Sequence, residues 1–401
     1  MDQAEAGLGG AKRDLRIDFF RGLALYMIIF DHIPGDPLSK FTYTHLGFSD
    51  AAEIFVFLSG VSCGIVYSRL LSRQGIDGLL RGLSWRALQI YIYYLIASLV
   101  TILVIVVSRD IAIPPNHQAF IVLREDPLAA IKSAILLISP PELPGILVLY
   151  LELTLFSIPM FILIAARSRA AALLTSGGLW LLAQLHPDLL PRLADYSYFN
   201  PIAWQFIFCI GMFVGTWYDS DISLEPFRTR PWVLLACTVV GVGLLYRIAS
   251  RQHLDLGMLA WSSETLSQMK ENLSAIRLVH FLSVAFLVAI FVRPNSPILH
   301  WPGASALIKS GRCSLQVFCA GAVVSVFLNL FIAAEAPPAW ERLILDCLAI
   351  MLIASMATAL MRSRLEHQPV GAYSAERSSM STTSLSKSGT LKEPDHSAPL
   401  E

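Results

Sequence analysis

Long apolar runs alternate with short polar segments along almost the whole chain. A helix that crosses a bilayer needs about 20 mainly apolar residues, and about ten runs approach or reach that length. They lie near 17–33, 50–71, 85–108, 145–166, 171–185, 200–218, 231–249, 275–292, 313–334 and 340–361. A shorter apolar stretch at 128–138 contains Lys132 and is interpreted as an interfacial segment. The pattern predicts an all-α polytopic membrane protein with about ten transmembrane helices in one bundle.

The composition agrees with this interpretation. Hydrophobic residues make up 55% of the 401 residues, charged residues make up 15%, and the mean hydropathy is +0.59. A soluble domain of this size is usually far less apolar. The formal net charge is zero and no basic cluster is interleaved with aromatic residues, so nucleic acid is not an expected partner. The cysteines show no spacing typical of a disulfide framework or a zinc site, and no metal is expected.

The polar segments predict an orientation and domain boundaries. If the N-terminus is cytoplasmic, the short inside loops hold most of the lysine and arginine, and the longer outside segments hold less. Both termini are therefore expected in the cytoplasm. We assign residues 1–16 to a cytoplasmic N-terminal segment and 17–361 to the membrane domain. Residues 362–401, rich in Ser and Thr, are expected to form a disordered cytoplasmic tail.

The first predicted helix carries ionisable residues into an apolar run. In RIDFFRGLALYMIIFDHIPG (16–35), Arg21 and His32 are eleven residues apart, so they share a face about 16 Å apart along the axis. Asp18 lies one turn before Arg21 on that face, whereas Asp31 is turned roughly 100° away from His32. A charge at the bilayer centre costs about 2.5–3.5 kcal/mol, so such residues normally face a bundle interior or a wet cavity.

Two interpretations of these residues stay open. Arg21 could pair with Asp18 near the inner interface, while Asp31 and His32 only cap the helix. In the functional interpretation, which we favour, the histidine removes a proton from a hydroxyl and the distant cation binds an anionic group such as a phosphate. A span of that length suits a long cosubstrate with an anionic head and a reactive tail. Acyl-coenzyme A has that shape.

These residues resemble the opening of a known family. RIDFFRGLALYMIIFDHIPG, followed by GFSDAAEIFVFLSG (47–60), closely resembles the start of the OpgC family, the membrane proteins that succinylate osmoregulated periplasmic glucans. Further resemblance lies at 200–211, 276–286 and 310–325. The Arg21-x10-His32 spacing is also similar to the signature of the wider transmembrane acyltransferases, which include the type-three sugar O-acyltransferases.

The resemblance implies an activity and a location. It implies a multi-pass protein among the lipids of the bacterial inner membrane, with acyl-CoA (succinyl-CoA by the family's name) as cosubstrate. The acceptor would be a hydroxyl of a periplasmic glucan. His32 would be catalytic, and Arg21 with Asp18 would belong to the donor-binding end. The family does not fix the acyl group, and whether the chain forms a homodimer stays open.

The second predicted helix opens with SDAAEIFVF (49–57). Asp50 followed three residues later by Glu53 is typical of a capping box, which needs no catalytic role. Because this helix begins on the side where His32 is expected, either carboxylate could also orient the imidazole or bind a sugar hydroxyl. Capping is favoured for Asp50, and both roles stay open for Glu53. The carboxylate that orients His32 is thus Asp31, Glu53 or Asp50.

Two further residues, like Asp50, are candidates for substrate contacts, and a third is a candidate for the donor end. Arg277 and His280 lie one turn apart in IRLVHF (276–281) and either line the cavity or are satisfied core residues. Arg277 is the candidate to hold a succinyl carboxylate, because guanidinium pairs with carboxylate through two hydrogen bonds. Arg312 is explained by the positive-inside bias, with a second contact to the donor's phosphates as the alternative.

The expected reaction is direct transfer. His32 removes the proton from a glucan hydroxyl, and the oxygen attacks the thioester carbonyl of acyl-CoA. An acyl-histidine intermediate is the alternative course. A function from another class is a transporter or flippase for an anionic or glycan substrate, with the charged residues as an ion path. Interrupted helices repeated in two halves would favour it, and the sequence shows no clear repeat of the first helix.

Overall fold

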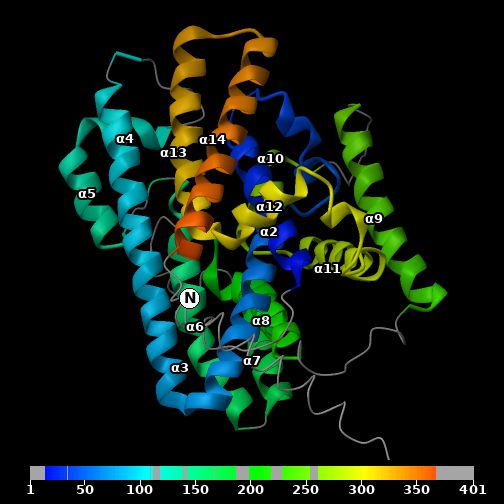
Figure 1. Cartoon of the computed structure of the whole chain (residues 1–401). Coiled ribbons are helices and arrows are strands. Elements are labelled where there is room, and N and C mark those ends of the chain that lie inside the picture. Colours follow the sequence, from blue (N-terminus) through cyan, green and yellow to red (C-terminus); the bar gives the residue numbers. More distant parts are fainter. Residues whose placement is uncertain are drawn as a thin grey trace, which may run out of the picture. The chain divides into compact units, whose positions relative to one another are not determined.

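The computed structural model describes residues 14–366, apart from 34, 109, 112–117, 139–140, 142, 167, 187–197, 218–227 and 253–260. Regular secondary structure in these residues is helical throughout (Figure 1). The helices are α2 (Leu15–Asp31), α3 (Ala51–Val107), α4 (Gln118–Glu125), α5 (Pro127–Ile135), α6 (Ile146–Ala165), α7 (Arg169–Leu185), α8 (Pro201–Thr216), α9 (Arg230–Arg251), α10 (Ser263–Glu271), α11 (Ala275–Phe291), α12 (Ala304–Arg312), α13 (Ser314–Glu335) and α14 (Ala339–Glu366). Short 3-10 helices include η1 (Leu38–Phe41), η2 (Tyr43–His45) and η5 (Pro297–Leu299).

The predicted all-helical class is confirmed, but the count of about ten transmembrane helices is not. Within the described residues, five helices are long and apolar enough to cross a membrane: α3, α6, α9, α13 and α14. α10 and α11 together make a sixth candidate, bent by 66° at the break between them. α2, α7 and α8 have 17, 17 and 16 residues. At 1.5 Å per residue each is about 25 Å long, less than the hydrocarbon core of about 30 Å.

α3 contains two of the predicted spans. Its 57 residues are interrupted at Gly75, where φ is 67° and ψ is −163°, a conformation that glycine adopts readily because it has no Cβ. Figure 1 shows α3 running one way before this break and returning beside itself after it. The Tyr67 hydroxyl donates to the Gly82 carbonyl (3.3 Å) and joins the two arms. The runs at 50–71 and 85–108 are therefore the two arms of one helical hairpin.

The first arm of α3 packs closely against α8. Gly60 and Gly64 on α3 face Gly211 and Gly215 on α8. A Cβ on Gly211 would lie 2.2 Å from the backbone oxygen of Phe57, so nothing larger than glycine fits there. Small residues at this spacing let membrane helices approach each other, which gains van der Waals contact that lipid cannot supply. The beginning of α3 is thus fixed on a rigid helix pair.

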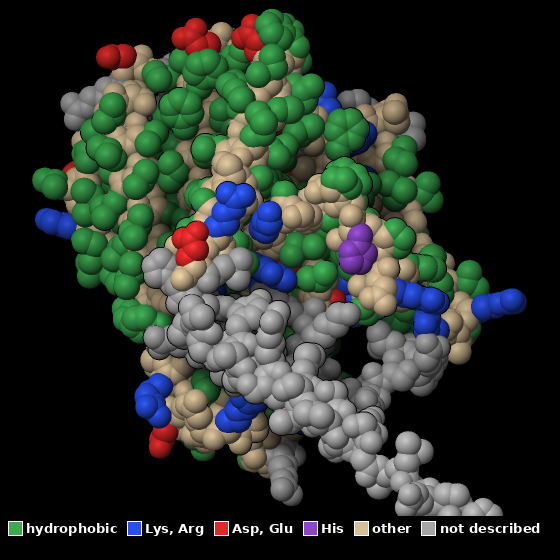
Figure 2. Space-filling model, in the orientation of Figure 1, with side chains coloured by type: hydrophobic (Ala, Val, Ile, Leu, Met, Phe, Trp, Pro, Cys, Tyr) green, Lys and Arg blue, Asp and Glu red, His purple; other side chains and the backbone are tan. Residues whose placement is uncertain are grey.

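Apolar side chains lie both inside the bundle and on its exposed helix faces. Trp204 and Leu149 are fully buried between helices, whereas Leu103, Leu245 and Leu352 are exposed. Figure 2 shows hydrophobic side chains over much of the upper part of the drawn face, with acidic side chains at its rim. So many exposed large hydrophobic side chains are unusual in a soluble protein and are typical of a lipid-facing surface.

The predicted boundaries differ slightly from those of the structure. The interfacial stretch at 128–138 contains α5, which ends at Ile135. Residues up to Ala357 form one compact unit, and α14 continues beyond it to Glu366, past the predicted start of the tail at 362. The rest of the predicted tail, and most of the predicted N-terminal segment 1–16, lie outside the described residues.

Candidate active site

His32 ends α2. Its backbone occupies the C-cap position, its side chain is exposed, and its Nδ1 lies 2.6 Å from the carbonyl oxygen of Ile28. A carbonyl oxygen only accepts hydrogen bonds, so the neutral imidazole carries its proton on Nδ1 and its lone pair on Nε2. The sequence left three carboxylates as candidates for orienting this ring. The structure gives the Nδ1 contact to a backbone carbonyl of the same helix.

Asp31 holds the loop that follows α2 in place through two hydrogen bonds. Its Oδ1 accepts a hydrogen bond from the Thr42 hydroxyl (2.5 Å), and its Oδ2 accepts one from the Thr44 hydroxyl (2.6 Å). Both threonines belong to the segment between α2 and α3. Asp31 therefore holds this segment against the end of α2, beside His32.

Arg21 is buried between α2 and α3. Its side chain donates from Nη2 to the carbonyl oxygen of Leu58 (2.6 Å) and to the hydroxyl of Ser62. Only 4% of Arg21 is exposed. It therefore lies in the bundle interior rather than at an interface.

Asp18 and Arg312, both expected at the donor end, are brought together by the packing of α12 on α2. A Cβ on Gly311 would lie 1.9 Å from the backbone oxygen of Asp18, so the two helices are in backbone contact. This places Arg312 Nε 3.2 Å from the Asp18 carboxylate. The guanidinium stays 30% exposed, whereas the carboxylate is almost completely buried. One buried negative charge is thus balanced by a cation that reaches the surface.

A network of buried charges surrounds the start of α3. Asp50 and Glu53 form the expected capping box: Asp50 accepts from the Ala52 amide and Glu53 accepts from the Asp50 amide (2.9 Å each). The same two side chains also bind Arg277, which donates from Nε to Glu53 (2.7 Å) and from Nη2 to Asp50 (3.0 Å). Capping and pairing with an arginine, weighed as alternatives in the sequence, are therefore combined in the structure.

Lys270 completes this group, and we call Asp50, Glu53, Lys270 and Arg277 the carboxylate cluster. Its Nζ lies 2.9 Å from Asp50 Oδ2. Lys270 is in α10 and Arg277 in α11, and across the bend between these helices both cations contact the same oxygen, Asp50 Oδ2. Burial alone would raise the pKa of Asp50, but Lys270 and Arg277 outweigh it and hold that pKa well below its usual range. Asp50 is therefore ionised at any physiological pH.

His280 lies beside the carboxylate cluster in a narrow site. Its Nδ1 is 2.7 Å from the Ser49 hydroxyl, which in turn is 2.6 Å from the Tyr43 hydroxyl. The ring fills the space between Gly47 and Gly243, where a Cβ would lie 2.1 Å and 2.8 Å from its Nε2. The structure thus brings the three residues proposed as substrate contacts, Asp50, Arg277 and His280, into one neighbourhood.

Several partners in this neighbourhood were not found from the sequence. From the sequence, Lys270 is only one of the charges in a longer outside segment, and Ser49, Tyr43, Thr42 and Thr44 are not candidates for any role. Their common feature is position, since all but Lys270 fall in the segment that joins two helices with buried charges. In the part of the chain that the structure describes, no group of three or more His, Cys, Asp or Glu side chains could hold a metal ion.

The fold and the buried ionisable side chains together define a class of protein. Apolar helices that hold ionisable side chains between them are typical of multi-pass membrane proteins with a functional site inside the membrane domain. The family described as OpgC protein matches residues 13–365, and the chain belongs to that family. It is therefore an acyltransferase-like membrane protein. No match was found among curated proteins or among solved structures.

Proposed function

We propose that the chain moves an acyl group, succinyl by family, from cytoplasmic acyl-CoA to a hydroxyl of a periplasmic glucan. The observation that carries this proposal is the tautomer of His32. Its Nδ1 is committed to the Ile28 carbonyl, which leaves Nε2 as a base on an exposed side chain. A general base near neutral pH is what the attack of a sugar hydroxyl on a thioester needs.

The proposed reaction is a direct transfer of the acyl group from the thioester to the glucan hydroxyl. His32 Nε2 removes the hydroxyl proton as the glucan oxygen attacks the thioester carbonyl and forms a tetrahedral intermediate. The intermediate collapses, the carbon–sulfur bond breaks, and the imidazolium returns the proton to the thiolate of coenzyme A. The products are the acyl ester of the glucan and free coenzyme A. No covalent bond to the protein is required.

The donor and the acceptor approach from opposite ends of α2 in this proposal. The first half of α2 holds Asp18 and Arg21, and Arg312 of α12 contacts Asp18 there. The positive-inside rule assigns this end of α2 to the cytoplasm. His32 lies at the other end, toward the periplasm of the bacterial cell, with both termini cytoplasmic. Since α2 has 17 residues, the two ends are about 25 Å apart.

In this proposal, the carboxylate cluster positions the part of the protein that the acceptor contacts. Arg277 is already bound by Glu53 and Asp50, so a succinyl carboxylate would have to compete with two carboxylates of the chain. We therefore propose that Arg277 positions the segment between α2 and α3, which Asp31 fastens beside His32. The acceptor would meet this segment, including the side chains around His280.

The test is glycan acylation in cells that express full-length variants. His32→Ala should reduce the acyl mass increment on periplasmic glucans by about 100-fold or more, the usual contribution of a general base. His186→Ala is the matched control, because His186 is also an exposed histidine at a helix C-cap. Mass spectrometry of the extracted glucans measures both. Unchanged glucans in His32→Ala cells, together with altered solute movement, would favour the transporter function instead.

A further inference from the structure

The last part of α9 presents one side to the segment between α2 and α3. Gly243, Arg247 and Arg251 are spaced four residues apart, so they lie along one side of the helix. A Cβ on Gly243 would lie 2.8 Å from the His280 ring and 3.4 Å from the Cα of Gly47. This side of α9 therefore packs on Gly47 and His280, next to the carboxylate cluster.

Arg247 is held at one edge of its guanidinium group. Its Nε donates to the carbonyl oxygen of Gly47 (2.8 Å), which fixes the direction of the half-buried side chain. Its two terminal nitrogens form no hydrogen bond or ion pair with the residues that the structure describes. Because a guanidinium can donate two parallel hydrogen bonds to a carboxylate, these nitrogens have the geometry to bind one.

The carboxylate cluster does not supply that carboxylate. Glu53 Oε1 binds Arg277, and its Oε2 accepts from a backbone amide. Asp50 Oδ1 accepts from another backbone amide, and its Oδ2 contacts both Lys270 and Arg277. Two acids thus face two bases, and each carboxylate oxygen already has a partner. Arg247 is therefore a cation beyond this matched set.

Two further basic side chains lie near Arg247. Arg251 is exposed and pairs with none of the acidic side chains in the described part of the chain. Burial, and after it the charges of Arg251 and Arg247, lower the pKa of His45. A cation has this effect on a histidine when the two lie close together. The positive-inside bias does not account for the group, because the proposed orientation places this end of α9 toward the periplasm.

The basic side of α9 also lies close to the proposed reaction centre. Gly47 is three residues after Thr44, which is at most about 11 Å along the chain. The Thr44 hydroxyl donates to Asp31 (2.6 Å), the residue before His32. An arginine side chain and a four-carbon acyl chain together can span this separation. The far end of an acyl group whose carbonyl lies at His32 is thus within reach of Arg247.

We infer that Arg247 binds the free carboxylate of a dicarboxylic acyl group, with Arg251 and His45 adding hydrogen-bond donors around it. This inference rests on the proposed function, because it takes an acyl thioester at His32. It gives Arg247 the role for which Arg277 was the candidate from the sequence, since Arg277 is already bound by Glu53 and Asp50. The site would then select a succinyl group over an uncharged acyl group of the same length.

The test compares succinyl-CoA with butyryl-CoA, which has the same four acyl carbons and a methyl group in place of the carboxylate. The full-length protein in neutral detergent is given each thioester with a neutral glucan, and kcat/KM for acyl transfer is measured. Arg247→Met should lower the preference for succinyl-CoA over butyryl-CoA about tenfold or more, because a charged hydrogen-bond donor is lost. Arg247→Lys should recover part of that preference. Arg230→Met is the matched control, because Arg230 is an exposed arginine at the opposite end of α9.

Binding to the His32→Ala protein separates this inference from the proposed function. That variant should transfer no acyl group but still bind succinyl-CoA more tightly than butyryl-CoA, and adding Arg247→Met should remove the difference. A wild-type protein with this binding preference and no acyl transfer would contradict the proposed function alone. An unchanged preference for succinyl-CoA in Arg247→Met would overturn the inference. So would an Arg247→Met protein that only loses bound phosphatidylglycerol, because the arginines would then form a lipid headgroup site.

Discussion

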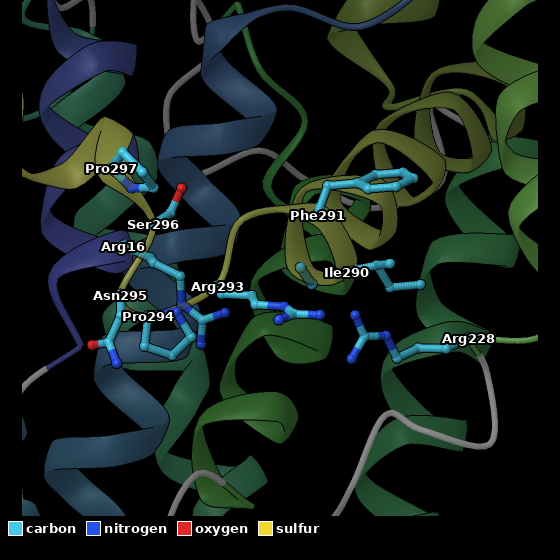
Figure 3. A pocket seen from close by; sticks show the side chains of 10 residues that line it. Arg16, Arg228, Ile290, Phe291, Arg293, Pro294, Asn295, Ser296 and Pro297 are labelled. Carbon is cyan, nitrogen blue, oxygen red and sulfur yellow. The ribbon is translucent and has the colours of Figure 1, made fainter.

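The two ends of α11 differ in what surrounds their positively charged side chains. At its start, Arg277 is enclosed with Lys270 among carboxylates, and the side chains of Glu53 and Asp50 are only 0% and 8% exposed. At its end, Arg16, Arg228 and Arg293 line a pocket of about 680 Å³, which Figure 3 shows. A buried cation matched by carboxylates fixes the protein's own geometry, whereas guanidinium groups that line a pocket border a space that a ligand can enter.

The largest expected loss of stability follows from replacing Arg277, the buried cation at the start of α11. Arg277→Met would leave the fully buried Glu53 without its cation, and breaking a buried pair in this way costs about 3–5 kcal/mol of stability. Arg293→Met, at the pocket, should change stability by less than about 0.5 kcal/mol. Denaturant unfolding of both variants in the same detergent measures the difference. The double variant Arg277→Met/Glu53→Gln should recover part of the loss, and equal losses at the two ends would contradict the comparison.

The sequence predicts the separate parts of this comparison but not their partners. Helical spacing and the cost of buried charge were enough to select Arg21, His32 and Arg277, and the capping-box pattern selected Asp50 and Glu53. The pairing of Arg277 with residues more than 220 positions earlier depends on how α3 and α11 pack, which no local pattern encodes. The tautomer of His32 was equally hidden, because its partner is a backbone carbonyl, and every residue has one.

The count of about ten spans is not confirmed, and the pocket lined by Arg16, Arg228 and Arg293 was not expected, for other reasons. Ten apolar runs predicted ten spans, but an apolar run also forms a short helix that packs inside the bundle, such as α8 with 16 residues. Arg228 and Arg293 were assigned to the positive-inside bias. That bias explains where arginines lie along the chain, and it carries no information on which way their side chains point.

A second, smaller perturbation tests how closely the residues around His280, near the start of α11, are packed. Gly243→Ala would place a Cβ 2.8 Å from the His280 ring, so the ring or α9 must shift. Overpacking of this kind typically costs 1–3 kcal/mol, and we expect about 2 kcal/mol. Gly241→Ala is the control on the same helix, because a Cβ there meets nothing within 4 Å. It should be neutral or stabilising by about 0.5 kcal/mol. Similar unfolding curves for the two variants would show that His280 is not confined.

A third variant loosens the segment beside His32 without changing any charge. Thr44→Val keeps the shape of the side chain and removes its hydrogen bond to the Asp31 carboxylate. Hydrogen bonds to charged groups contribute about 1.5–3 kcal/mol, and the half-buried position favours the lower value. Thr238→Val, which removes an exposed bond to the Leu234 carbonyl in the same helix, should cost less than about 0.5 kcal/mol. Limited proteolysis between α2 and α3 should quicken only in Thr44→Val.

The smallest effect concerns two buried acids, Asp36 in the segment after α2 and Asp346 in α14, where like groups meet instead of opposite charges. Asp36 and Asp346 are only 1% and 2% exposed and interact with each other. Two ionised carboxyls buried together would repel each other, so one of them is expected to keep its proton. Burial, the larger cause, raises the pKa of Asp36 above its ordinary 3.8. A raised carboxyl pKa disfavours the ionised form in the folded state, so stability falls as pH rises from the unfolded pKa through the folded one.

Asp346→Asn should flatten that pH dependence. Its amide donates a hydrogen bond to Asp36 without needing a proton from solvent, so the pair no longer takes up a proton on folding. Through this pair, the melting temperature of the wild type should fall by about 2 °C as pH rises above the ordinary carboxyl pKa of 3.8, and the variant should lose that decrease. The carboxylate cluster provides the internal contrast, because Asp50 stays ionised over this whole range. The same pH dependence of melting temperature in the variant and the wild type would mean that this pair takes up no proton on folding, and that Asp36 and Asp346 do not share one.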